Sequence, residues 1–189
     1  GNSFSQDAVE QYLYELFDAA GIKVVIGNMY IPGCSLERHY NNSVSDKAEY
    51  AYRKIVGGEK TNTPKTKLID ALLDEPWDYI SLQQASGKSG EYDTYNPYLK
   101  SLISYLRRYA PKKDFKLVWH QTWAYYGRYT AACTWFEAIS GKKVVGNSYA
   151  PATVDDGKKA VAQNAAHEAV RNPYKVTIMK DFQTAPSAK

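Results

Sequence analysis

A serine near the amino end of the sequence has the surroundings of a nucleophile. It is Ser3, in the run Gly-Asn-Ser-Phe-Ser at residues 1–5, directly before a segment with helical periodicity. A serine at such a junction can present its hydroxyl to a substrate while its backbone N–H donates to an oxyanion. The alternative is a simple helix-capping serine, a role that Ser5 fits better than Ser3. Ser3 is therefore the candidate nucleophile.

Two further segments carry groups that could stabilise negative charge. Gly33 lies in a loop after an apolar run, where a glycine lets the backbone approach a substrate closely, although an ordinary turn glycine is the alternative. Gln83 and Gln84 end a second apolar run, and a side-chain amide there can donate to an oxyanion. Ser86 follows them directly.

The three histidines are isolated from one another. His120 ends a third apolar run and is a candidate base or substrate contact, with a structural histidine as an equal alternative. His39 is expected in a loop and His167 on the surface of a late helix. Their spacing does not suit metal ligation, and no glycine-rich phosphate loop occurs, so neither a metal nor another cofactor is expected.

Length and composition narrow the class of protein. The 189 residues suit one domain over 1–189, and no apolar run reaches the roughly 18 residues of a membrane span. The net charge of +4 comes from scattered basic pairs, which argues against a nucleic-acid partner. Cys34 and Cys133 are expected as two buried thiols, with a disulfide as the less favoured alternative. The 14% of aromatic residues suits either sugar stacking, around residues 119–129, or core packing.

Helical and strand patterns alternate along the chain. They predict helices over 5–21, 67–74, from 96–97 onward, 128–139 and 155–170. Strands are predicted over 22–26, continuing towards Tyr30, and over 78–84 and 115–121. A hairpin is predicted over 50–63, with a helix as the competing prediction. Residues 31–42 and 142–153 are predicted as loops. This order predicts a three-layer α/β/α sandwich on a mostly parallel sheet. Ligands bind at the carboxyl ends of such strands, so we expect Ser3, Gly33, Gln84 and His120 to converge there.

Taken together, these runs resemble the SGNH (GDSL-type) serine hydrolases. Residues 1–5 resemble the first block of that superfamily, with Asn2 in place of its usual Asp, and residues 30–39 resemble the second. Residues 77–84, 117–124 and 127–137 are similar to a branch known as a domain of unknown function, with many secreted bacterial members. The resemblance covers nearly the whole chain.

The resemblance implies a flavodoxin-like fold and ester hydrolysis through a serine acyl-enzyme. Ser3 would be the nucleophile, the N–H groups of Ser3 and Gly33 would donate to the oxyanion, and Gln84, or less favourably Ser86, would replace the third-block Asn. The substrate would be a small acyl or acetyl ester, with acylated carbohydrate as the candidate class. A secreted or periplasmic location is also implied.

The sequence departs from the family in two places. The family's Asp-x-x-His block does not occur: residues 125–126 are followed directly by 127–128, where the family has a further strand, helices and this block. The strand that the family has before residue 1 is also missing. We expect either a longer protein or an incomplete relative, so a non-catalytic carbohydrate- or ester-binding protein is the second functional hypothesis. His120 is preferred to His39 as the base, with Glu37 as a distant orienting group. Weak or absent esterase activity is therefore expected for this chain.

Overall fold

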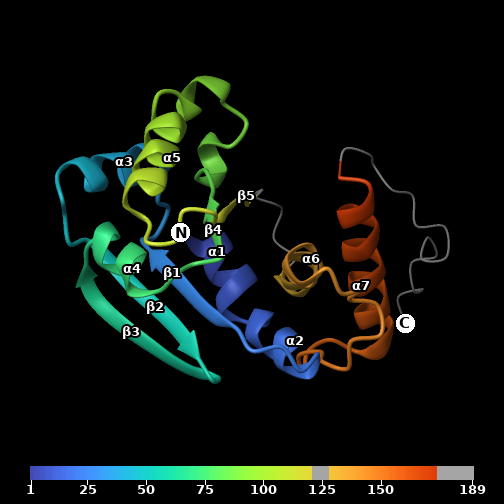
Figure 1. Cartoon of the computed structure of the whole chain (residues 1–189). Helices are drawn as coiled ribbons and strands as arrows, with labels where there is room; N and C mark the ends of the chain where they lie inside the picture. Colours follow the sequence, from blue (N-terminus) through green and yellow to red (C-terminus); the bar gives the residue numbers. More distant parts are fainter. Residues whose placement is uncertain (121–127, 174–189) are drawn as a thin grey trace. The chain divides into compact units, whose positions relative to one another are not determined.

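The structure is a computed structural model that describes residues 1–120 and 128–173, in two compact units (Figure 1). The first unit comprises residues 1–10 and 25–124, and the second comprises 11–24 and 125–189, each within the described ranges. The expectation of one domain over 1–189 stays a prediction. Within the described ranges, every helix is too short or too polar to span a bilayer.

An antiparallel sheet of three strands lies in the first unit. Its order is β1 (Val25–Tyr30), β2 (Tyr50–Val56) and β3 (Glu59–Thr66). β2 and β3 form the predicted hairpin, in which Gly57 and Gly58 take φ angles of +57° and +84°. Such angles favour glycine, so the turn could be predicted from its sequence.

A second sheet pairs β4 (Tyr79–Leu82) with β5 (Lys116–Trp119) in parallel, which confirms both predicted strands. The prediction of a mostly parallel sheet is not confirmed, because β1 pairs with β2 in antiparallel register. Exposed and buried residues alternate at the start of β1, as in a sheet with one open face, whereas an apolar run had suggested burial on both faces. Gly1 contacts β1 in the parallel pattern, donating to Met29 O (2.5 Å) and accepting from Ile31 N (3.1 Å).

The first unit also contains helices and shorter helical turns (Figure 1). They are α1 (Ser3–Ser5), the π-helix η1 (Gln6–Glu10), α3 (Leu36–Val44), α4 (Leu68–Asp74), the 3₁₀ turns η2 (Ser86–Lys88) and η3 (Tyr92–Tyr95), and α5 (Tyr98–Tyr109). The predicted positions of α4 and α5 are confirmed, although Pro97 rather than Asn96 is the N-cap of α5.

One helix prediction and one loop prediction were wrong. The expected helix over 5–21 is broken into α1, η1 and α2 (Leu13–Ala19), because the π-helix ends at Glu10 and a non-helical step separates it from α2. The expected loop over 31–42 contains α3, whose N-cap Ser35 accepts a hydrogen bond from Arg38 N at 3.2 Å.

Apolar packing in the first unit forms separate clusters. One joins α4, α5 and the approach to β5 through Leu72, Leu106, Ala110 and Phe115, and another joins Ile31, Cys34 and Tyr50. Gly27 in β1 permits close packing, because a Cβ there would lie 2.6 Å from Cη2 of Trp77. The strand therefore approaches the Trp77 ring more closely than a side chain would allow.

The second unit is helical in its described part. It contains α2, α6 (Arg128–Ser140) and α7 (Asp156–Arg171), and the last two confirm the predicted helices. The rings of Phe17 and Phe136 meet edge-on at 5.2 Å, and His167 is only partly exposed because its Nδ1 lies 2.5 Å from Glu137 Oε1. His167 was expected on the surface of a late helix, and it lies in α7 with part of its surface exposed. Cys34 and Cys133, one in each unit, are buried free thiols, as expected.

Candidate active site

The side chain of Asn2 connects three of the segments that sequence analysis selected. Asn2 is 1% exposed, and its Nδ2 donates to Cys34 O at 3.1 Å, next to Gly33. Its Oδ1 accepts from Phe4 N at 3.1 Å and from Gln83 Nε2. The Ser3, Gly33 and Gln83 segments therefore meet at one buried amide.

Ser3 is exposed, with its backbone held from both sides. Asn2 is the N-cap of α1, and its backbone N–H donates to Ser5 Oγ at 2.9 Å, which closes a capping box. The expected N-cap role of Ser5 was thus wrong, since Ser5 supplies the reciprocal bond instead. This arrangement leaves the Ser3 hydroxyl at the surface of a fixed turn.

Gly33 lies in an exposed turn directly after β1. Its φ angle is +62°, a conformation that glycine adopts without steric cost, and a Cβ placed there would meet no atom within 4 Å. Cys34 N closes the turn by donating to Ile31 O at 3.1 Å. The turn therefore provides an open and shaped stretch of backbone on the same segment that Asn2 holds.

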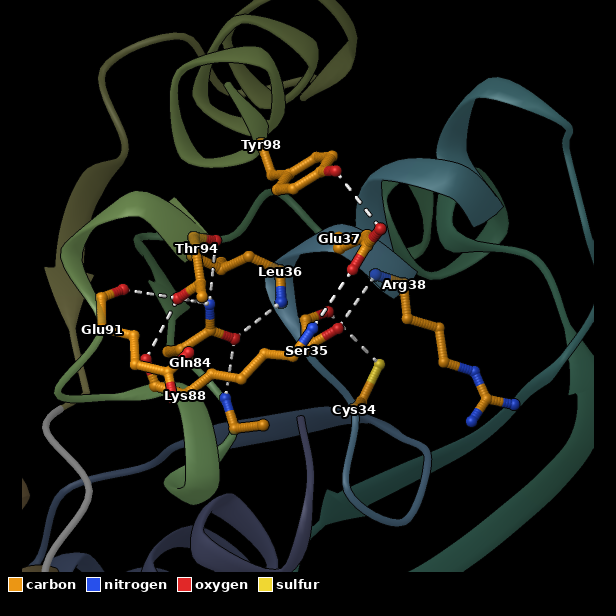
Figure 2. Close-up of polar contacts among 11 residues, drawn as sticks. Cys34, Ser35, Leu36, Glu37, Arg38, Gln84, Lys88, Glu91, Thr94 and Tyr98 are labelled. Carbon is orange, nitrogen blue, oxygen red and sulfur yellow. Dashed lines mark hydrogen bonds and ion pairs between the residues drawn. The ribbon is translucent and has the colours of Figure 1, made fainter. Parts of the chain in front are cut away.

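Gln84 is buried and uses its amide to fix the chain around it (Figure 2). Its Oε1 accepts from Leu36 N (3.1 Å) and Ala85 N (2.9 Å), and its Nε2 donates to the carbonyl and the hydroxyl of Thr94, both at 3.1 Å. A primary amide has two N–H groups, so none is left for a substrate oxyanion. This geometry favours a structural role for Gln84 over the predicted role as an oxyanion donor. Ser86, the less favoured alternative, begins η2.

Glu37 lies above Gln84 and joins α3 to the segment that follows β4 (Figure 2). Its carboxylate accepts from Lys88 Nζ and from Tyr98 Oη, both at 3.2 Å. These contacts do not support the expected role of Glu37 in orienting a histidine base. These contacts instead tie η2 and α5 to α3.

His120 follows β5 and is buried, with 3% of its surface exposed. Its backbone N–H continues the parallel ladder by donating to Leu82 O at 2.8 Å. Burial, with a smaller contribution from the α-amino group of Gly1, lowers the pKa of His120 from 6.5 to about 4. The imidazole is therefore neutral at neutral pH, which is the state that can accept a proton.

His39 is a second buried imidazole, and sequence analysis placed it wrongly in a loop. It lies in α3, where its Nδ1 is 2.9 Å from Tyr50 Oη, its ring stacks on Tyr50 at 5.5 Å, and its Nε2 is 3.2 Å from Gly1 N. Burial lowers the pKa of His39 well below its ordinary value. The buried residues Leu36, His39 and Asn42 repeat every three positions, as on one face of a helix, but two of them are polar, so the sequence carried no apolar stripe there.

Other groups bear on the chemistry that this region can perform. No cluster of three or more metal-ligating side chains occurs among residues 1–120 and 128–173. Of the aromatic stretch, Trp119 is 42% exposed beside the Tyr95 ring at 5.5 Å, and Tyr129 is buried in the second unit. Trp123, Tyr125 and Tyr126 lie outside the described residues.

The comparisons agree on one family. The family described as "Domain of unknown function (DUF4886)" matches residues 1–127 and 125–169. The chain is also similar to a DUF4886 family protein from Bacteroides uniformis ATCC 8492, known from a crystal structure, with 40% identity, 96% of each chain covered and a TM-score of 0.92. No curated protein matches it. The chain belongs to the DUF4886 family.

Proposed function

We propose that this protein is a serine ester hydrolase of the SGNH type, in which Ser3 attacks the acyl carbon. One observation carries the proposal: the buried Asn2 amide joins the Ser3, Gly33 and Gln83 segments, which are the segments that resemble consecutive blocks of that superfamily. Exposure of Ser3 and of the Gly33 turn also supports it, because a substrate can reach both. The proposal includes the flavodoxin-like fold that the resemblance implies.

The proposed reaction has two steps. In the first step, Ser3 Oγ bonds to the acyl carbon, His120 accepts the hydroxyl proton, and the N–H groups of Ser3 and Gly33 donate to the developing oxyanion. The ester C–O bond then breaks, and the alcohol leaves with the proton from His120. In the second step, water adds to the acyl carbon and gives a proton to His120. The bond between the acyl carbon and Ser3 Oγ then breaks, the acid leaves, and His120 returns the proton to Ser3 Oγ.

A small acyl or acetyl ester is the proposed substrate, with an acylated carbohydrate as the candidate class. Exposed rings favour a sugar, since Trp119 and Tyr92 expose 42% and 78% of their surface and can stack on a pyranose face. The resemblance to secreted bacterial proteins supports a secreted or periplasmic location as part of the proposal. Neither a metal nor another cofactor is needed for this chemistry.

The second candidate function is binding of the same ligands without turnover. It is favoured by the sequence, which has no Asp-x-x-His block, and by Glu37, whose carboxylate contacts Lys88 and Tyr98. A base without an orienting acid is less effective. We therefore expect slow hydrolysis for this chain if the first candidate function is correct.

Hydrolysis of p-nitrophenyl acetate and labelling by a fluorophosphonate distinguish the two candidate functions. The hydrolase predicts turnover and an adduct that mass spectrometry locates on Ser3, and Ser3→Ala should lower kcat by more than about 10³-fold. His120→Ala should lower kcat as well, while Ser148→Ala, at an exposed serine of the second unit, should have no effect. Turnover that survives Ser3→Ala would refute the hydrolase. Saturable binding of an acetylated sugar without turnover would support the second function.

A further inference from the structure

We infer that Asn28 and Glu10 are positioning residues that hold the Ser3 turn in its reactive conformation. The inference rests on the proposed function for its catalytic consequence, and on a series of hydrogen bonds for its geometry. This series of hydrogen bonds begins at an ion pair on the antiparallel sheet and ends at the backbone beside Ser3. Neither residue lies in the segments 1–5, 30–39 and 77–84 that resemble the family, and neither takes part in the reaction steps described above.

Glu10 ends the π-helix η1 and faces the antiparallel sheet. Its carboxylate accepts from Asn28 Nδ2 at 2.5 Å and from Arg53 Nη1 at 3.1 Å, and its backbone oxygen accepts from Lys60 Nζ at 2.6 Å. Asn28 and Arg53 are cross-strand neighbours in the β1–β2 register. The sheet therefore holds both the side chain and the backbone of the last residue of η1. Single π-helical turns such as η1 are often found at functional sites.

The charge of Glu10 determines how the Asn28 amide is oriented. A carboxylate only accepts hydrogen bonds, so the NH₂ group of Asn28 must face Glu10 and its oxygen must face the other way. That oxygen lies 3.1 Å from Ser5 Oγ and accepts from it. Asn28 is 4% exposed, so water does not replace these partners without a local opening.

Ser5 transmits this orientation to the backbone next to Ser3. Its single proton is directed to Asn28 Oδ1 and to Asn2 O (2.9 Å), which leaves its lone pairs for the N–H of Asn2 at 2.9 Å. The backbone of Asn2, directly before Ser3, is thus held by Ser5 and, through it, by Asn28. A displacement of about 1 Å in a reacting group can lower a rate about 100-fold, so this support bears on catalysis.

Close packing shows that the arrangement has little freedom. A Cβ placed on Gly1 would lie 2.0 Å from Asn28 Oδ1 and 2.2 Å from Ser5 Oγ. The backbone that leads into Ser3 therefore lies directly against the amide and the hydroxyl. Removal of the Asn28 side chain would open space beside residues 1–5 as well as remove two hydrogen bonds.

A complementary exchange of the two side chains tests the inference. Asn28→Asp places two carboxylates against each other, and Glu10→Gln removes the charge that orients Asn28. The double variant Asn28→Asp/Glu10→Gln restores one amide facing one carboxylate, with the amide oxygen still available to Arg53. We expect each single variant to lower kcat about 10–100-fold with KM nearly unchanged, and the double variant to recover most of that loss.

The matched control is Asn41→Asp with Glu59→Gln, the same chemical changes at two exposed positions, which should leave kcat unchanged. Amide hydrogen exchange supplies a readout that needs no activity: Asn2 N–H should exchange faster in each single variant and regain protection in the double variant. Recovery of kcat and of exchange protection together supports the inference. Single variants that retain wild-type kcat and protection, or a double variant no better than the singles, would overturn it.

The same experiment separates this inference from the proposed function. If the wild-type chain neither hydrolyses the ester nor is labelled at Ser3, the hydrolase proposal fails. The exchange protection of Asn2 in the single and double variants then still decides whether Asn28 and Glu10 position the turn.

Discussion

Acid should destabilise this protein through His120, and the size of the effect can be worked out. The pKa of His120 is lowered from 6.5 to about 4, mainly by burial. The free energy of unfolding is not reduced by this histidine above pH 6.5, because its imidazole is neutral there in both the folded and the unfolded state. Between pH 6.5 and 4 the unfolded state binds a proton that the folded state does not, so the free energy of unfolding falls.

Each pKa unit corresponds to about 1.4 kcal/mol, so the complete shift is worth roughly 3 kcal/mol, lost across that window. Urea unfolding at a series of pH values between 7.5 and 4 measures this loss for the wild type and for His120→Gln. Other titrating groups act alike in both proteins, so the difference in slope reports His120. Equal slopes in the two proteins would refute the reasoning that His120 is buried in its neutral form.

Three further changes test the packing and the amide roles. Gly27→Ala should lower the free energy of unfolding, measured by thermal unfolding, by about 1–3 kcal/mol, because the new Cβ would overlap the Trp77 ring. Gly87→Ala, with open space around it, should lower it far less. Gln84→Ala should lower the free energy of unfolding by about 1–3 kcal/mol, since the substitution leaves buried N–H and carbonyl groups without their partner. Proteolysis of the segment that follows residue 84 should also become faster. Unchanged proteolysis would contradict that role. Phe136→Ala should cost about 3–5 kcal/mol, measured by circular dichroism, through loss of a fully buried ring.

The sequence by itself determined the helices, strands and turns whose conformation depends on interactions between neighbouring residues. Gly57 and Gly58 specify the β2–β3 turn because few other residues accept positive φ angles at both positions, and the apolar runs of β4 and β5 identify them as strands. The starts of α4 and α7 were predicted within a residue or two for the same reason. In these segments, the interactions that decide the conformation lie within a few residues of one another.

Only the tertiary structure decided which distant groups meet. The antiparallel partner of β1 depends on the return of the chain as β2, and β1 itself carries no signal of that direction. Gln83 and Gln84 are identical in type, yet one donates to Asn2 and the other binds Leu36 and Thr94, because successive side chains at a strand end point to opposite sides. A buried amide takes its role from its partners, and those partners are brought to it by the fold.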